Sequence, residues 1–280
     1  MERSLQALIR ELAEATEGIE AIALDRVQAL AGEFGVSLRE VELTALEARV
    51  LPRRYLRSLG TVGWGGQIRL LRSTVAVVGL GGLGGNVVEG LARMGVGQLI
   101  IMDGDVFLDH NLNRQVLCSE GDVGLLKAEV ARAHVAQINA AVEVVVHAEE
   151  ATRQSLPRWL AGAEVVVDAL DRLPSRLMLQ GVAQKMNVPM VHGAIAGYSG
   201  QVMTIFPGDG GLRALFGGGS VPEQGVEVQL GCPAATPMMV AAWQVQEVVK
   251  ILLGRGQLLR HKMLFMDAEA GTVEFLEIGS

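Results

Sequence analysis

A glycine-rich stretch of the chain has the Gly-x-Gly-x-x-Gly spacing of a phosphate-binding loop. Its glycines are Gly79, Gly81, Gly82 and Gly84. Glycines let a backbone approach a phosphate closely, and a helix that begins after them presents free N–H groups and a positive dipole end. Asp103 lies 19 residues beyond Gly84, a spacing at which a carboxylate can hydrogen-bond ribose hydroxyls. We expect a nucleotide site here; the motif alone points as readily to NAD as to ATP.

Three charged residues further along the chain favour a triphosphate over a dinucleotide. Arg114 offers a planar guanidinium for bidentate phosphate contacts, and Lys127 adds a compact charge. Asp171 follows an apolar run, and a carboxylate at a strand end can hold Mg²⁺ together with phosphate oxygens. Each residue also has a purely structural interpretation. Arg114 could pair with Asp105 or Asp109, Lys127 could be an ordinary helix residue, and Asp171 could cap a helix.

The apolar pattern predicts the elements that must bring these residues together. From residue 72 onward, strand-like runs alternate with helical patterns, which indicates βαβ units in a parallel sheet. The predicted strands are 74–79, 98–103, 142–148, 164–168, 189–194 and 201–206. The predicted helices are 86–94, 127–139, 155–160, 175–187 and 237–254. Ligands of such sheets bind at the carboxyl ends of the strands, where the glycine loop, Asp103 and Asp171 are expected to meet.

The predicted fold is α/β: a doubly wound, mostly parallel, Rossmann-like sheet with a C-terminal antiparallel extension. Residues 263–267 and 272–278 form the predicted closing hairpin. The turn-rich segments 207–219 and 220–237 interrupt the pattern, and loops of this length are usually functional or mobile.

Residues 1–50 differ from the rest and predict a small helical element, followed by the main domain at 51–280. Two sets of apolar residues recur at helical spacing, the second being Ile19, Ile22, Val27 and Leu30. Ser37 and Glu40 fit a capping box that opens a further helix. We interpret this element as a docking or dimerisation unit.

Composition and charge exclude several function classes. The chain has 280 residues and a formal charge of −7, so we expect no general affinity for nucleic acid or an anionic membrane. The beginning of the sequence lacks the continuous apolar core of a signal peptide. Two cysteines, Cys118 and Cys232, cannot build a disulfide framework. This cysteine usage predicts a reducing, cytoplasmic location.

Several motifs together make the chain resemble the MoeB/ThiF/HesA family, bacterial relatives of the ubiquitin-activating enzymes. The motifs are Arg54-Tyr55-Leu56-Arg57, the glycine loop, Asp103-Gly104-Asp105, Asn111-Leu112-Asn113-Arg114-Gln115, Gly124-Leu125-Leu126-Lys127, Asp168-Ala169-Leu170-Asp171 with Arg176, and the closing helix from Gln244 to Gly254. The resemblance covers about residues 53–280. The Asn-Leu-Asn-Arg-Gln stretch is far more specific than the glycine loop alone.

The resemblance implies an ATP-dependent adenylyltransferase whose substrate is a small ubiquitin-like sulfur-carrier protein ending in Gly-Gly, in molybdopterin or thiamine-type cofactor biosynthesis. The carrier's terminal carboxylate would attack the α-phosphate of MgATP and release pyrophosphate. By this analogy Asp103 holds the ribose, Arg114 and Lys127 stabilise the phosphates, and Asp171 binds Mg²⁺. The further nucleotide-binding candidates are Asp105, Asn111 and Gln115. Arg57 matches an arginine that reaches into the neighbouring subunit's site, which implies a homodimer.

The sequence departs from the family pattern at its cysteines. Many family members bind a structural Zn²⁺ with two Cys-x-x-Cys pairs, but Leu212 and Leu215 stand where the first pair would be. Two distant cysteines cannot form a four-ligand site, so we predict no zinc. The nucleophilic cysteine of some relatives is also missing from this region, which argues against a thioester step. Arg172 follows Asp171 where relatives usually have asparagine.

Other functions remain open from the residues alone. One is adenylation of another carboxylate, such as one on a modified tRNA base, although the acidic charge disfavours it. A second is an NAD-dependent dehydrogenase, which would have no use for Arg114, Lys127 and Asp171 around one phosphate chain. A third is a nucleotide-binding partner protein without turnover. His192 is either a polar contact in the groove that admits the carrier's tail or a satisfied core histidine.

Overall fold

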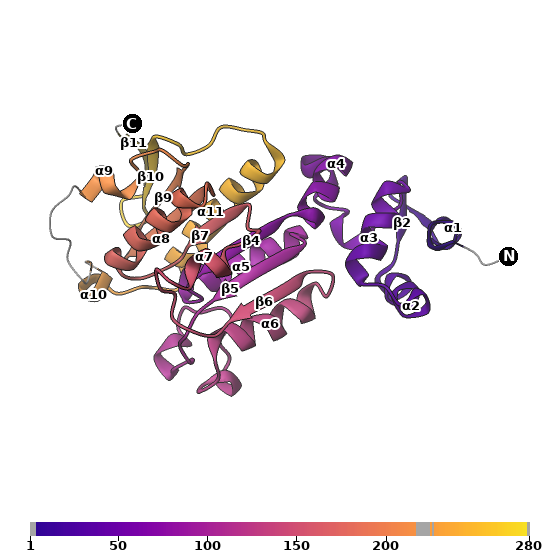
Figure 1. The fold of residues 1–280 in the computed structure, drawn as a ribbon, viewed down its shortest axis with the longest axis horizontal. Coiled ribbons are helices and arrows are strands. Elements are labelled where there is room, and N and C mark those ends of the chain that lie inside the picture. The colour runs from indigo at the N-terminus through magenta and orange to yellow at the C-terminus, as the bar shows by residue number, and fades with distance from the viewer. Residues whose placement is uncertain (1–3, 217–224, 226, 279–280) are drawn as a thin grey trace.

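The computed structural model describes residues 4–216, 225 and 227–278 and is built around a large mixed sheet (Figure 1). This eight-stranded sheet has the order β11-β10-β9-β8-β7-β4-β5-β6. Its parallel strands are β4 (Thr74–Val78), β5 (Gln98–Met102), β6 (Glu143–His147), β7 (Val165–Asp168) and β8 (Met190–Ala196). Its antiparallel extension consists of β9 (Ser199–Ile205), β10 (Lys262–Asp267) and β11 (Thr272–Glu277). The predicted fold class and the closing hairpin are confirmed.

Helices cover both faces of the sheet because its central strands are apolar on both sides. In β4, Val75 and Val77 belong to one core, whereas Ala76 and Val78 belong to the other. The first core packs under α5 (Gly82–Met94), α6 (Lys127–Ile138) and α11 (Ala235–Leu253). The second packs under α7 (Leu156–Trp159), α8 (Leu173–Lys185) and α9 (Leu212–Phe216). Strands buried on both faces are expected of a doubly wound sheet.

The N-terminal element contains a small sheet as well as helices. It consists of α1 (Leu5–Glu11), β1 (Glu14–Thr16), β2 (Ile19–Ile22), α2 (Leu24–Phe34), α3 (Leu38–Glu47) and β3 (Leu51–Pro52). The three strands pair in the order β1-β2-β3. The predicted capping box is present, because Ser37 Oγ accepts a bond from the Glu40 N–H at 3.2 Å. In Figure 1 this element lies at the right, next to α4 (Leu59–Arg72).

One prediction for this element was wrong. Ile19 and Ile22 were expected on the same helical pattern as Val27, but they lie in strand β2, and α2 begins only at Leu24. The cause is the Glu17-Gly18 turn, where both residues have positive φ values of 51° and 78°. Two consecutive positive φ angles produce a tight hairpin turn that pairs β1 with β2.

The remaining elements are short. They are the 3₁₀ turns Arg53–Tyr55, Asp109–Asn111 and Glu120–Asp122, and the helix α10 (Glu227–Leu230). Within the turn-rich segments predicted at 207–219 and 220–237, residues 217–224 and 226 lie outside the described residues. None of the helices in the described ranges is long and apolar enough to cross a bilayer.

Candidate active site

The register of the parallel strands aligns the predicted site residues at one edge of the sheet. Val78 at the end of β4 is opposite Met102 on one side and Asp168 on the other. Asp168 is in turn opposite His192 in β8. The residues that follow these strand ends are the glycine loop, Asp103 and Asp171, as the sequence predicts.

Two glycines of the loop, the first and the last, lie where the backbone has no room for a side chain. A Cβ on Gly79, whose φ is 92°, would lie 2.6 Å from the Ala169 carbonyl oxygen. A Cβ on Gly84 would lie 1.8 Å from the Gly79 carbonyl oxygen. Helix α5 begins at Gly82, so the N–H groups of its first turn are directed to the loop. The local geometry fits a phosphate group held at a helix N-terminus.

Asp103 fastens the loop to the end of β5. Its Oδ2 accepts a hydrogen bond from the Leu80 N–H at 2.7 Å, and its Oδ1 accepts one from the Asp105 N–H at 2.9 Å. Burial raises the pKa of Asp103, and the charge of Lys127 opposes this shift. Each carboxylate oxygen retains a lone pair, so Asp103 can still accept hydrogen bonds from a ribose.

Lys127 is a buried cation paired with an exposed acid. Its Nζ lies 2.9 Å from Asp105 Oδ2, and its side chain is 8% exposed against 76% for Asp105. The main chains are also joined, because the Lys127 N–H donates to the Asp105 carbonyl at 3.0 Å. Asp105 can rotate into solvent at small cost when an anionic ligand offers Lys127 a better partner. The pair with Asp105 thus holds the Lys127 ammonium group at the site while no ligand is bound.

Arg114 has no acidic partner among the described residues. Its Nη1 donates to the His110 carbonyl at 3.0 Å and to Asn113 Oδ1 at 2.8 Å. Pairing with Asp105 or Asp109, the structural alternative, is not seen. The guanidinium is therefore available to an anionic ligand.

Two buried amides support the loop that carries Arg114. Asn111 is 4% exposed; its Oδ1 accepts from the Leu108 N–H at 3.0 Å, and its carbonyl accepts from the Gln115 N–H at 2.9 Å. Gln115 is 5% exposed and lies beside Gly81. Its Oε1 is buried without a hydrogen-bond partner. A buried acceptor left unpaired beside the glycine loop fits a donor supplied by a nucleotide.

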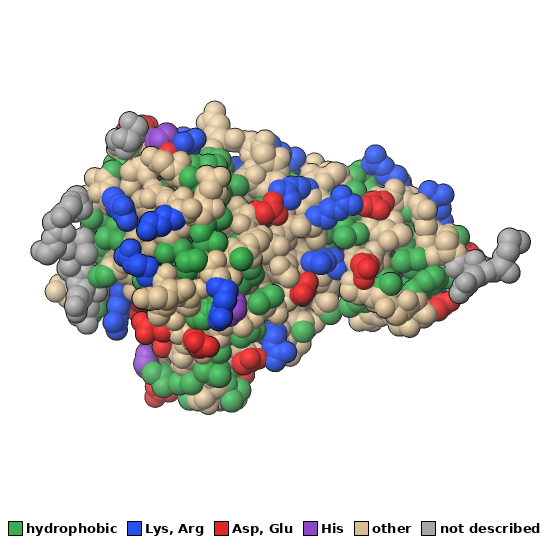
Figure 2. All heavy atoms as spheres, viewed as in Figure 1, with side chains coloured by type: hydrophobic (Ala, Val, Ile, Leu, Met, Phe, Trp, Pro, Cys, Tyr) green, Lys and Arg blue, Asp and Glu red, His purple; other side chains and the backbone are tan. Residues whose placement is uncertain are grey.

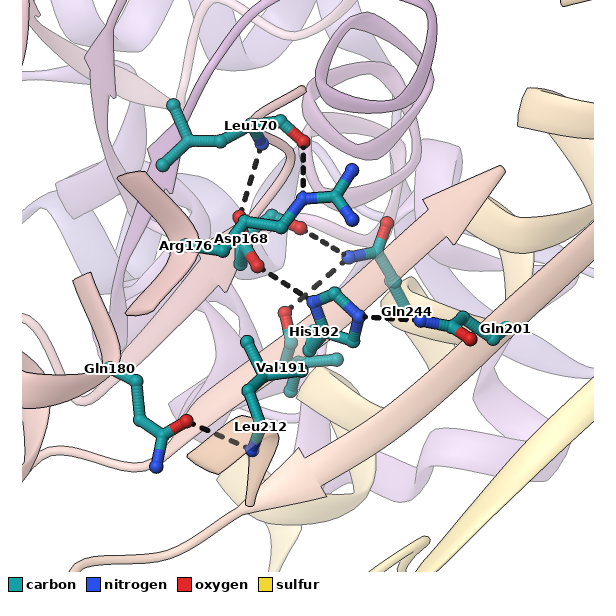
Figure 3. Close-up of polar contacts among 9 residues, drawn as sticks. All are labelled: Asp168, Leu170, Arg176, Gln180, Val191, His192, Gln201, Leu212 and Gln244. Atoms are coloured by element: carbon teal, nitrogen blue, oxygen red, sulfur yellow. Dashed lines mark hydrogen bonds and ion pairs between the residues drawn. The ribbon is translucent and has the colours of Figure 1, made fainter. Parts of the chain in front are cut away.

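A buried network that sequence reasoning missed shapes the turn before Asp171 (Figure 3). Asp168 is fully buried; its Oδ2 bonds His192 Nδ1 at 2.7 Å, and its carbonyl accepts from Gln244 Nε2 at 2.9 Å. Arg176 Nε donates to the Leu170 carbonyl at 2.9 Å. His192 is fully buried as well, and burial lowers its pKa. His192 is therefore a core histidine. The signal in the sequence for this network was that Asp168 and His192 each stand at the carboxyl end of an apolar, strand-like run.

A cleft of about 410 Å³ lies between α8 and the antiparallel extension, and Asp171 belongs to its lining. The cleft is lined by Asp171, Arg176, Ala194, Gln201, Leu230 and Phe265, among others. Asp171 is exposed and has no ion pair among the described residues. A free carboxylate beside a phosphate loop fits a Mg²⁺ ion, which would add Lewis-acid stabilisation of phosphate oxygens.

Arg57 lies away from the other site residues of its own chain. Its guanidinium forms a bidentate pair with Glu17, with Nη2–Oε1 at 2.7 Å and Nη1–Oε2 at 3.1 Å. Nearby, Arg255, just beyond the C-terminus of α11, donates to the Thr61 carbonyl. Pro237, near the opposite end of α11, lies against Gly82. A helix of 19 residues is about 28 Å long, so Arg57 is remote from the glycine loop.

The residues at the family's zinc position do not fit a zinc ion. Leu212 is fully buried in the second core, and its N–H donates to Gln180 Oε1 at 3.0 Å. No group of three potential ligands occurs among the described residues. Of the two cysteines, Cys118 has its pKa raised by burial, and the Cys232 carbonyl accepts a bond from Asn113 Nδ2 at 3.5 Å. The prediction that the protein holds no zinc remains a prediction.

The glycine loop, the arginine without an acidic partner, the buried lysine and the free carboxylate lie at one edge of a doubly wound sheet, and together they suit the phosphate chain of a nucleotide. The site is therefore of the nucleotide-binding class. The chain belongs to the ThiF family, whose model matches residues 54–280. It is 40% identical over 227 residues to the SAMP-activating enzyme E1 of Haloferax volcanii, covering 79% of this chain and 83% of the relative. It is 34% identical to the adenylyltransferase and sulfurtransferase MOCS3 of Aedes aegypti, covering 80% of this chain and 52% of the relative.

Solved structures agree on the fold. Escherichia coli MccB with ATP superposes with a TM-score of 0.70 at 23% identity, covering 81% of this chain and 72% of that chain. PaaA superposes with a TM-score of 0.69 at 22% identity, covering 81% of this chain and 82% of that chain. The chain spans about half the length of the MOCS3 relatives, so a part of those proteins has no counterpart in the alignment.

Proposed function

We propose that this protein adenylates the C-terminal carboxylate of a small ubiquitin-like sulfur-carrier protein ending in Gly-Gly. The observation that carries the proposal is the unpaired Arg114 beside the glycine loop, with Lys127 and Asp171 at the same sheet edge. Relatives named as a SAMP-activating enzyme and as adenylyltransferases support the substrate class. Molybdopterin and thiamine-type pathways both use such chemistry, and the cytoplasm is the proposed location.

The proposed reaction depends on positioning and on charge neutralisation. The carrier carboxylate attacks the α-phosphorus of ATP, a C(O)–O–P bond forms, and the bond to the β-phosphate breaks so that pyrophosphate leaves. The glycine loop and Asp103 hold the nucleotide, while Arg114 and Lys127 stabilise the charge that builds up on the phosphates. Asp171 would hold the Mg²⁺. Phosphate binding would draw Lys127 away from Asp105, whose exposed side chain is free to turn aside.

The cleft beside Asp171 is the proposed path for the carrier's tail. It follows the β8–β9 hairpin and is lined by small residues such as Ala194 and Gly200. A Cβ on Gly200 would come within 2.3 Å of a Val240 methyl group, so the floor of the cleft is already tightly packed. A Gly-Gly terminus is slim enough to reach the nucleotide through such a space.

We further propose a homodimer in which Arg57 completes the partner's site. Arg57 cannot cross the length of α11 to reach the glycine loop of its own chain, but its side chain is 84% exposed and can meet a second copy. The test is complementation: Arg57→Ala and Lys127→Ala subunits are each expected to keep only a small residual activity, whereas mixed dimers regain part of the lost activity. Mixed dimers without any regained activity would contradict action in trans.

Pyrophosphate exchange into ATP tests the function directly. Exchange should depend on a candidate carrier and disappear when the carrier's last glycine is removed. Comparing molybdopterin-type and thiamine-type carriers would identify the pathway. ATP binding without exchange for any carrier would instead support a nucleotide-binding partner protein, and exchange with a tRNA carboxylate would support the other adenylation.

A further inference from the structure

The N-terminal element pairs an acid with every arginine of the segment Arg53-Arg54-Tyr55-Leu56-Arg57. The pairs are Arg53 with Glu14, Arg54 with Glu42, and Arg57 with Glu17. The three acids come from β1, from α3 and from the β1–β2 turn. This element ends at Pro52 and so lies before residue 54, where the family match begins. In Figure 2 acidic and basic side chains are interspersed over this end of the molecule.

The middle pair anchors the segment in the protein interior. Glu42 is fully buried and lies 3.1 Å from Arg54 Nε, and its Oε2 accepts a hydrogen bond from the Tyr55 hydroxyl at 2.8 Å. Asn139 Nδ2 donates to the same hydroxyl at 3.2 Å and to the Ala92 carbonyl at 3.0 Å. The N-terminal element, the arginine segment and the nucleotide-binding domain thus meet in one network.

The outer pair acts on the exposed arginine. Glu17 occupies the two terminal nitrogens of Arg57 and holds the guanidinium in one plane. A guanidinium has five N–H donors, so three remain for a second anion. The turn that carries Glu17 is fixed by the positive φ angles of Glu17 and Gly18 and by the pairing of β1 with β2. Arg57 therefore projects from a rigid support.

We propose that the N-terminal element is an acidic clamp that orients Arg57 toward the nucleotide site of a second copy of this chain, with Glu17 as the positioning residue. The inference rests on the proposed function of Arg57 in trans. Glu17 touches no substrate; it acts only through Arg57. The buried Glu42–Tyr55–Asn139 network gives the clamp its rigidity, and Glu17 sets the direction of the exposed side chain.

Carrier-dependent pyrophosphate exchange by the full-length protein, with the variants Glu17→Gln, Arg57→Ala and their combination, tests the clamp. Because an exposed ion pair is weak, we expect Glu17→Gln to lower kcat by about 3–10-fold. The KM for the carrier should stay unchanged. Glu14→Gln is the matched control: it removes the neighbouring pair with Arg53 and should leave exchange within about twofold of the wild type.

The double variant separates positioning from a merely structural role. If Glu17 acts through Arg57, Glu17→Gln should have no further effect once Arg57 is alanine. An equal loss in both backgrounds would overturn the proposal, as would unchanged or increased exchange in Glu17→Gln, or full exchange in Arg57→Ala. If the wild-type protein shows no pyrophosphate exchange with any carrier tested, the proposed function fails and the clamp fails with it. If only Glu17→Gln behaves as wild type, the clamp alone fails.

Discussion

Charged side chains are paired differently at the two ends of the parallel strands of the main sheet. The amino edge is the side on which these strands begin, and the carboxyl edge is the side on which they end. At the amino edge the arginines are matched: Arg39 pairs with Glu143, Arg69 with Glu164, and Arg72 with Glu47. At the carboxyl edge Arg114 and Asp171 have no oppositely charged partner among the described residues. Lys127 does have a partner, but that partner, Asp105, has a side chain that is 76% exposed.

The difference separates scaffold from site. A paired charge contributes to holding two elements together, whereas an unpaired charge next to a glycine loop is available to a ligand. The comparison predicts that removing charges at the amino edge changes stability and that removing them at the carboxyl edge changes chemistry.

The largest effect is expected at the buried acid of the amino edge. Glu42→Ala removes the buried carboxylate that Arg54 and the Tyr55 hydroxyl share and should lower the free energy of unfolding by about 3–5 kcal/mol. Chemical denaturation measures this change. The control, Glu47→Ala, removes an exposed pair with Arg72 and should cost less than about 1 kcal/mol. Equal losses in both variants would erase the distinction between buried and exposed pairs.

The next effect belongs to the carboxyl edge. Arg114→Ala should reduce pyrophosphate exchange by about 10²–10³-fold, because charge on the phosphates loses a preorganised donor. The melting temperature should stay near that of the wild type, since the Arg114 side chain donates its hydrogen bonds within its own loop. Arg72→Ala, at the other edge, should retain exchange. A comparable loss of exchange in Arg72→Ala would show that the amino edge also affects the chemistry and would contradict this distinction.

A smaller effect concerns pH and the buried histidine behind the site. Burial lowers the pKa of His192 below its ordinary value of 6.5, so the unfolded chain binds this proton first as pH falls. Stability is therefore fully present above pH 6.5 and declines below it, by at most about 1.4 kcal/mol per pH unit from this group. Thermal melts between pH 7.5 and 5.5, compared with His192→Gln, measure the contribution. A variant as acid-sensitive as the wild type would rule out His192 as the cause.

Neither replacing a cysteine nor adding a chelator is expected to change the activity or the stability of the protein. Cys232→Ser should keep carrier-dependent exchange, because adenylation needs no thiol. EDTA followed by gel filtration should leave the melting temperature unchanged, since a buried leucine occupies the position of the first zinc pair. Stoichiometric zinc in the purified protein would contradict this expectation.

The bounds of the central strands could be predicted from the sequence, because these strands are buried on both faces of the sheet. The strands predicted at 74–79 and 98–103 correspond to β4 and β5 within one residue, because apolar runs buried on both faces leave little freedom. Helix α5 begins at Gly82 rather than at residue 86, since the glycine loop continues directly into the helix and glycine gives no helical signal.

Contacts between distant residues were not predictable. The pairing of Glu17 with Arg57 depends on a hairpin whose Glu-Gly turn lacks the usual Asn or Asp. The bond between Asp168 and His192 depends on the register of β7 against β8, which a single sequence does not display.

The position of β4 in the middle of the sheet has a consequence for synthesis on the ribosome. One neighbour, β5, follows within about 25 residues, but the other, β7, starts at Val165, nearly 90 residues after β4 ends. At typical translation rates of about 5–20 residues per second, one side of β4 stays unpaired for several seconds. Asn139, which bonds Tyr55, emerges only shortly before β6. The nascent chain therefore carries an open, apolar strand edge that other chains or chaperones can meet before β7 closes it.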